Sequence, residues 1–194
     1  DEIQCGVGRS GTFFAFEQGA IVPDVILCSK GIGGSQPLSV VIYNKKLDEW
    51  TAGAHAGTFR GNQLAMKAGT IVVNRVSNPQ FLKEVQEKGE ILKAGLLKLK
   101  EKVSIIGDVR GVGLMIGCEF VDPKGKPDAI GSLPASGDIA LQVQQKCFEN
   151  KLVMEKGGRF GSFKSDALNE LSRSKACILL VISVSLLHIW SVLS

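Results

Sequence analysis

The pattern of hydrophobic and polar positions changes along the chain. Residues 1–50 alternate short apolar runs with glycine-rich connections. Two of these runs, Val25–Cys28 and Leu38–Tyr43, follow a proline and end at polar residues. Short continuous apolar runs of this kind predict strands that are buried on both faces, as in a layered α/β sheet.

The next pattern is helical. Residues 62–73 are rich in Ala, Leu and Met and predict a buried helix. Residues 80–103 predict a long amphipathic helix, in which Gly89 and Gly95 each cost up to about 1 kcal/mol relative to alanine. Its apolar face is expected to consist of Phe81, Val85, Leu92, Leu96, Leu99 and Val103.

The remaining pattern combines strands with one more helix. Residues 105–121 contain two strand-like runs, and residues 122–125 form a turn sequence. Residues 136–150 predict an amphipathic helix with Ser136 as its N-cap and Asp138 in its first turn. The fold class is therefore α/β, with a boundary near residues 75–80 between a glycine-rich part and an α+β part.

Composition and charge exclude several classes of protein. The chain has 194 residues, of which 44% are hydrophobic and 22% charged, so it is not a disordered polymer. The net charge of +4 comes from scattered Lys and Arg, which gives no support for nucleic-acid binding. Five widely spaced cysteines favour free thiols in a reducing, cytoplasmic compartment, and two distant histidines give little material for a zinc site.

The C-terminal sequence does not fit a globular enzyme. Residues 176–194 are nineteen residues without a formal charge, a length that just spans a bilayer core. Two interpretations remain open for residues 165–194: an aberrant apolar tail, or a membrane anchor formed by residues 176–194. The aberrant tail is the favoured one.

Two sequence motifs are candidates for a chemical role. The stretch from Gly6 to Gly11 matches G-x-G-x-x-G, but only five residues precede it and Thr12-Phe13-Phe14 begins a helix poorly, which disfavours a dinucleotide site. Lys30 follows the apolar run Val25–Cys28 with one serine between them, and it precedes a Gly-rich stretch. Burial there lowers the pKa of a lysine and frees its amine for Schiff-base formation, whereas the alternative is a lysine that only extends from a strand end into water.

The surroundings of Lys30 resemble a known family. The sequence from Asp1 to Ser35 resembles the signature of class III pyridoxal-phosphate-dependent aminotransferases, without a gap. Residues 55–63 and 107–114 also resemble this family, and residues 55–63 most resemble the diaminobutyrate–2-oxoglutarate aminotransferase group. The resemblance covers roughly residues 1–162. Its matching positions in the first block are Gly6, Arg9, Gly11, Asp24, Lys30, Gly34 and Ser35.

The resemblance implies a cofactor site for pyridoxal 5'-phosphate. Lys30 would form a Schiff base with the cofactor and afterwards carry the substrate proton. Asp1 would pair with the pyridine nitrogen, and Gln4 would lie near the phenolic oxygen of the ring. Thr58 would donate its hydroxyl to the cofactor phosphate across the interface of a homodimer.

The resemblance also implies a fragment. Family chains are roughly twice as long, and their first half supplies a phosphate cup and an aromatic residue that stacks on the ring. Residues 1–78 would be the end of the large cofactor domain of a fold-type I enzyme, and residues 79–164 a truncated small α/β domain. In the family an arginine for the substrate carboxylate follows a stretch like Gly157–Ser162, whereas this chain has Ser165 at the expected place and Lys164 before it.

The function implied by the resemblance is transamination. An amino group would pass from L-2,4-diaminobutyrate to 2-oxoglutarate, giving glutamate and aspartate semialdehyde. The alternatives are an ornithine, 4-aminobutyrate or acetylornithine aminotransferase, or a non-catalytic relative that binds a partner subunit or is tail-anchored. The partners implied are therefore an amino acid, a 2-oxo acid and a second copy of the chain.

Overall fold

The structure is a computed structural model that describes residues 1–157 and 177–181. It is a mixed α/β fold whose chain forms two compact units, Asp1–Glu87 and Lys88–Ser194, and the division falls inside one long helix. Each unit has its own hydrophobic core. The expected ranges of the large and small domain remain predictions.

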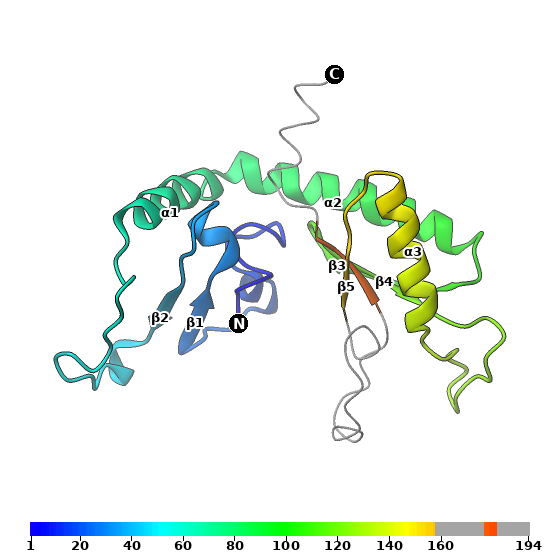
Figure 1. The fold of residues 1–194 in the computed structure, drawn as a ribbon, viewed down its shortest axis with the longest axis horizontal. Coiled ribbons are helices and arrows are strands. Elements are labelled where there is room, and N and C mark those ends of the chain that lie inside the picture. The colour runs from blue at the N-terminus through cyan, green and yellow to red at the C-terminus, as the bar shows by residue number, and fades with distance from the viewer. Residues whose placement is uncertain (158–176, 182–194) are drawn as a thin grey trace. The chain divides into compact units, whose positions relative to one another are not determined.

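The first unit is built around an antiparallel pair of strands, β1 (Val25–Cys28) and β2 (Val40–Tyr43). Short 3-10 helices precede and follow them: η1 (Ala15–Gly19), η2 (Lys30–Gly33) and η3 (Lys45–Leu47). Helix α1 (Gln63–Val76) and the start of α2 (Pro79–Lys100) complete the unit. Figure 1 shows α1 lying beside η2, the turn that follows β1.

The prediction that both strands are buried on two faces is wrong. Cys28 is buried, but Val25 and Leu27 on β1 and Val41 on β2 are exposed. The physical reason is that the described residues cover only one face of this two-stranded sheet. On that face, residues of the N-terminal loop, η2 and the two helices pack together, chiefly Val7, Cys28, Ile32 and Val76, with Val72 and Phe81 beside them.

Helix α1 begins where its sequence predicts, but the prediction that it is buried is wrong, because only one face of it packs and most of its residues, among them Leu64, are exposed. The Asn62 side chain caps it by accepting hydrogen bonds from the backbone N–H groups of Leu64 (3.0 Å) and Ala65 (3.2 Å). Its buried positions are Ala65, Gly69 and Val76, which follow a helical period. A Cβ on Gly69 would lie 3.1 Å from the carbonyl oxygen of Ile32, so this glycine lets α1 approach η2 closely.

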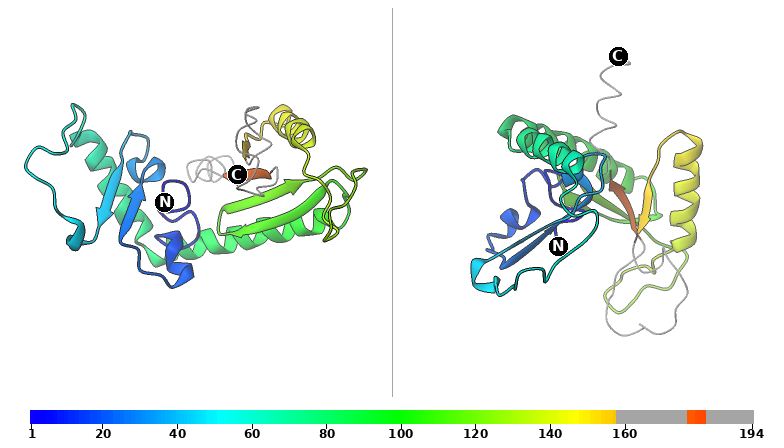
Figure 2. Two further views of the ribbon diagram at one scale, coloured as in Figure 1. Left: turned by 90° about the horizontal axis from the view of Figure 1, so that it is seen from below. Right: turned by 60° about the vertical axis from the view of Figure 1, so that its left-hand side comes forward.

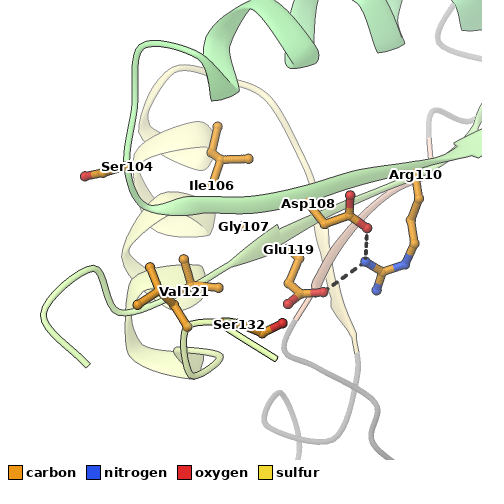
Figure 3. A pocket seen from close by; sticks show the side chains of 10 residues that line it. Ser104, Ile106, Gly107, Asp108, Arg110, Glu119, Val121 and Ser132 are labelled. Carbon is orange, nitrogen blue, oxygen red and sulfur yellow. Dashed lines mark hydrogen bonds and ion pairs between the residues drawn. The ribbon is translucent and has the colours of Figure 1, made fainter. Parts of the chain in front are cut away.

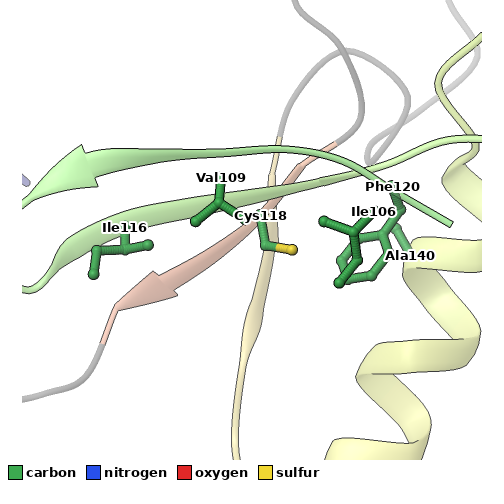
Figure 4. Close-up of a cluster of buried hydrophobic side chains, with 6 residues drawn as sticks. All are labelled: Ile106, Val109, Ile116, Cys118, Phe120 and Ala140. Atoms are coloured by element: carbon green, nitrogen blue, oxygen red, sulfur yellow. The ribbon is translucent and has the colours of Figure 1, made fainter. Parts of the chain in front are cut away.

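The second unit contains a four-stranded sheet in the order β3-β4-β6-β5, and all neighbouring strands are antiparallel. The strands are β3 (Ile106–Val112), β4 (Met115–Phe120), β5 (Glu155–Gly157) and β6 (Cys177–Val181). Helix α3 (Gly137–Glu149) contacts β4, β5 and β6, and Ser136 caps it as predicted, accepting from the N–H of Ile139. Figure 4 shows the buried cluster between sheet and helix, which comprises Ile106, Val109, Ile116, Cys118, Phe120 and Ala140.

The two glycines of α2 have different surroundings. Gly89 is buried, and a Cβ there would lie 2.2 Å from the carbonyl oxygen of Gly113, in the turn between β3 and β4. Gly95 is exposed, and a Cβ there would meet nothing within 4 Å. Figure 2 shows the β3–β4 hairpin running alongside the C-terminal part of α2. Gly89 is therefore a point of close approach between helix and hairpin, which the sequence did not reveal.

Part of the C-terminal stretch belongs to the sheet of the second unit. Strand β6 lies between β4 and β5, and its register pairs Ile116 with Leu180 and Lys156 with Ile178. The other residues of the 165–194 stretch, with Ser165 and Lys164, lie outside the described residues. Within the described ranges no helix has the length and apolarity needed to cross a bilayer. Cys5, Cys28, Cys118 and Cys147 are free thiols, as expected.

Candidate active site

Lys30 stands at the first position of a tight turn after β1. Its backbone φ is +48°, in the left-handed region that non-glycine residues adopt rarely and at a cost of about 1–3 kcal/mol. The preceding residue, Ser29, fixes the turn by donating its hydroxyl to the carbonyl oxygen of Leu38 (3.1 Å). The Lys30 side chain is exposed, so the burial that its place after an apolar run led us to expect is not observed.

The segment Asp1–Gln4 lies against the same strand. The backbone N–H of Glu2 donates to the carbonyl oxygen of Leu27 at 2.9 Å, three residues before Lys30. Asp1 is exposed, and its Oδ1 accepts a hydrogen bond from the N–H of Ile3 at 2.8 Å. Gln4 is half-buried. The fold therefore brings the segment with Asp1 and Gln4 to the strand that leads into Lys30.

Glu2 is a buried residue near Lys30 that no sequence motif singled out. It is only 5% exposed, and its two carboxylate oxygens accept hydrogen bonds from the backbone N–H groups of Ala15 (2.9 Å) and Phe16 (3.0 Å). Burial of Cys28 and then the nearby charge of Glu2 raise the pKa of the Cys28 thiol. No local spacing marks this glutamate, because its partners lie 13 and 14 residues further along the chain.

The glycine motif at residues 6–11 does not form a dinucleotide site. The residues form consecutive turns, with Gly8 and Gly11 at φ +84° and +88°, and no strand precedes them in residues 1–5. The helix that follows, η1, is a short 3-10 helix. A Cβ on Gly11 would lie 2.5 Å from Cγ of Gln86, whose side-chain amide donates to the carbonyl oxygen of Gly11 at 2.7 Å. The motif thus packs the N-terminal loop onto α2.

Thr58 lies away from these residues, in the exposed loop between β2 and α1. The N–H of Arg60 donates to the carbonyl oxygen of Gly57 (3.0 Å), so Thr58 occupies a turn. Arg60 also donates from Nη1 to the carbonyl oxygen of His55. Both Figure 1 and Figure 2 show this loop, in cyan, projecting away from the N-terminal segment. A direct role of Thr58 beside Lys30 of the same chain finds no support, which leaves the role across a homodimer interface as a prediction.

A separate cavity of about 760 Å³ lies in the second unit, between β3, β4 and the loop near Ser132. Arg110 donates from Nη1 to Asp108 (2.8 Å) and to the buried Glu119 (2.9 Å), as Figure 3 shows. The hydrogen bond from Arg110 holds the pKa of the Asp108 carboxyl below its usual range. In the described part of the chain, every buried side-chain nitrogen and oxygen has a hydrogen-bond partner.

The exposed amine of Lys30 fits a cofactor that carries an aldehyde. The segment beside β1 adds the exposed carboxylate of Asp1 and the half-buried amide of Gln4. Among the described residues, no cluster of His, Cys, Asp and Glu would hold a metal ion. The chemistry that these groups support is therefore condensation of an amine with a carbonyl compound and proton transfer by that amine.

Comparison with known proteins gives the family. Residues 1–152 match the family model Aminotransferase class-III, and the chain belongs to this family. Diaminobutyrate–2-oxoglutarate aminotransferase of Rhizobium meliloti (strain 1021) is 49% identical over 162 residues, which are 84% of this chain and 34% of that protein. Acetylornithine aminotransferase of Bacillus cereus is 46% identical over 120 residues, 61% of this chain and 31% of that protein.

A solved structure supports the same fold. A Bacillus anthracis aminotransferase has a TM-score of 0.73 and 26% identity, and the match covers 97% of this chain and 41% of that one. The chain thus spans about a third of the length of the curated relatives it matches. The expected membership of class III is confirmed, and the chain is a fragment of that fold.

Proposed function

We propose that this chain is the lysine-bearing part of an aminotransferase that moves an amino group from L-2,4-diaminobutyrate to 2-oxoglutarate. The observation that carries the proposal is the 49% identity to a diaminobutyrate–2-oxoglutarate aminotransferase over 84% of the chain. The match to the acetylornithine aminotransferase covers only 61% of this chain. That difference favours diaminobutyrate over acetylornithine as the amino donor.

Class III aminotransferases use pyridoxal 5'-phosphate. When bound, this cofactor supplies an aldehyde that condenses with amines and a ring that withdraws electrons. Lys30 would hold the cofactor through its amine and, once released, would move the proton of the substrate carbon. Asp1 would keep the ring nitrogen protonated, Gln4 would orient the ring oxygen, and Thr58 of a second copy would bind the phosphate.

The fold supplies a reason for Lys30 to act. Its amine is exposed on a turn with positive φ, which is fixed by Ser29 on one side and by α1 packing on η2 behind it. A backbone held in a sparsely populated conformation aims a side chain in a direction that a regular strand end does not. In this proposal residues 1–78 belong to the large cofactor domain, and residues 79–164 belong to the small domain.

The experiment that tests the cofactor role is reductive labelling. A full-length aminotransferase that contains this sequence is mixed with pyridoxal phosphate, reduced with borohydride and mapped by mass spectrometry. We expect label concentrated at Lys30 and lost in Lys30→Arg, because a guanidinium keeps the charge but forms no stable imine. Lys45 and Lys46, which are also exposed, serve as internal controls. Label spread evenly over all three lysines would contradict the proposal.

The amino donor is tested separately. Glutamate formed from 2-oxoglutarate is measured with diaminobutyrate, ornithine and 4-aminobutyrate in parallel, on a full-length aminotransferase that contains this sequence. Diaminobutyrate is expected to give the highest kcat/KM. If it is the poorest donor, the assignment within the family is wrong while the cofactor role of Lys30 stands.

A further inference from the structure

We propose that Glu2 is a positioning residue of the cofactor site, because it fixes the segment with Asp1 and Gln4 between β1 and η1. The inference rests on the proposed function for the roles of Asp1 and Gln4, but not for the placement of the segment. Glu2 itself would not touch the cofactor, since its carboxylate is buried and both of its oxygens accept backbone hydrogen bonds.

Glu2 is tied to three parts of the first unit. Its backbone N–H donates to Leu27 on β1 (2.9 Å), and its carbonyl oxygen accepts from the N–H of Gly6 (3.0 Å). Its carboxylate accepts from Ala15 and Phe16 at the start of η1. Asp1 is adjacent to Glu2 in the sequence, and Gln4 lies two residues after it, so the positions of both depend on Glu2.

The packing around Glu2 is close. A Cβ on Gly6 would lie 2.8 Å from Cβ, from the carbonyl oxygen and from Oε2 of Glu2. The chain therefore wraps tightly around the glutamate side chain, and a shift of this side chain moves the Asp1–Gly6 loop with it. A carboxylate that accepts two backbone N–H bonds is a strong anchor, because charge-assisted hydrogen bonds are about twice as strong as neutral ones.

Two variants weaken the anchor in different ways. Glu2→Gln keeps the size but places an amide N–H₂ against a backbone N–H. Ala15→Pro removes one of the two donors at the first position of η1, where proline fits, and the preceding Phe14 already has an extended backbone (φ −113°, ψ 142°). Glu17→Gln is the matched control, since the Glu17 carboxylate caps the same turn through Phe14 N–H (2.6 Å) but is exposed.

The first measurement is amide hydrogen exchange, which needs no cofactor. In Glu2→Gln and Ala15→Pro we expect exchange at the amides of Ile3 and Gly6 to become about tenfold faster, the factor that corresponds to a loss of about 1.4 kcal/mol. In Glu17→Gln these amides should exchange as in the parent chain. Unchanged exchange in both anchor variants would overturn the inference.

The second measurement uses pyridoxal phosphate bound to a full-length aminotransferase that contains this sequence. Under the proposed roles, a misplaced Asp1 would leave the ring nitrogen less protonated, and the bound cofactor would then lose its other proton only at higher pH. The pH midpoint of the absorbance of the bound cofactor should therefore rise in both anchor variants, and cofactor retention should fall about tenfold. If Glu2 only stabilised the fold, its replacement would not move the pH midpoint of the cofactor absorbance. An unchanged midpoint, with the cofactor fully retained, therefore overturns the inference.

The two arms separate this inference from the proposed function. If the parent chain takes no label at Lys30, the proposed function fails, and the exchange measurement alone decides the role of Glu2. If the parent chain is labelled at Lys30 but the anchor variants behave like Glu17→Gln in both arms, the proposed function stands and the inference about Glu2 fails.

Discussion

The contact between Gly89 and the β3–β4 turn makes a quantitative prediction about stability. Gly89→Ala would place a Cβ 2.2 Å from the oxygen and 2.5 Å from the carbon of the Gly113 carbonyl, where ordinary contacts begin at 3.4 Å. Because both sides of the contact are backbone, no side-chain rotation relieves it. The helix and the hairpin must separate by about 1 Å, taken as the difference between 3.4 and 2.2 Å.

The magnitude follows from two opposing effects. Overpacking of a fitted core costs about 1–3 kcal/mol, and we take the upper end because backbone must move. The higher helix propensity of alanine stabilises the helix by up to about 1 kcal/mol, so the net loss in the free energy of unfolding is about 2 kcal/mol. Gly95→Ala brings the same propensity gain with no contact within 4 Å and should stabilise the chain by up to about 1 kcal/mol.

The assay is thermal unfolding followed by circular dichroism. For a chain of this size, 1 kcal/mol shifts Tm by roughly 2–4 °C, so Gly89→Ala should lower Tm by about 4–8 °C and Gly95→Ala should raise it by about 2–4 °C. An isolated peptide of residues 79–100 is the control, because both substitutions should raise its helicity equally. If the Tm of Gly89→Ala equals or exceeds that of the parent chain, the close contact with the hairpin does not affect stability, and the reasoning is refuted.

Three further predictions concern other parts of the chain. The lowered pKa of Asp108 means that its ion pair with Arg110 stabilises the fold above the usual aspartate pKa, and that this contribution is lost as pH falls through the lower folded value. In Asp108→Asn the free energy of unfolding, measured by urea unfolding at several pH values, should therefore fall less steeply below about pH 4. The difference is expected to be well under 1 kcal/mol, because the Asp108 and Arg110 side chains are about half exposed. An equal fall with pH in the two chains would contradict this. The raised pKa and burial of Cys28 predict alkylation by iodoacetamide at pH 8 more slowly than at the half-buried Cys5, measured by peptide mapping, and faster labelling at Cys28 would refute it. Truncation before β6 leaves β4 and β5 without their shared neighbour, so we expect a lower Tm for the second unit, and an unchanged Tm would show that β6 adds nothing.

Local sequence patterns predicted which helices and strands form better than they predicted how these elements are buried. The strand at Val25–Cys28, the cap at Ser136 and the long helix after residue 79 follow from spacing within a few residues, and the structure confirms them. The burial of β1 could not be predicted in the same way, because burial depends on what covers a face. An apolar run is compatible with one covered face or with two.

The candidate site shows the same limit. Lys30 was found from its place after an apolar run and from the family signature, yet its exposure and its positive φ were not foreseen. A left-handed backbone at a lysine has no sequence signal, since the surrounding structure imposes it. Glu2 was missed because its partners Ala15 and Phe16 are distant in sequence, although the motif that contains it was recognised.

The positive φ of Lys30 means that selection for stability and selection for activity favour different residues at this position. Glycine adopts φ near +48° without steric cost, and asparagine does so more readily than lysine, so either residue at position 30 should relax the turn. A library screened only for thermal resistance is therefore expected to enrich replacements of the one amine on which the proposed chemistry depends. Any lineage released from the need for this amine would gain stability by the same change. In sequences related to this one, glycine or asparagine at this position would mark such lineages.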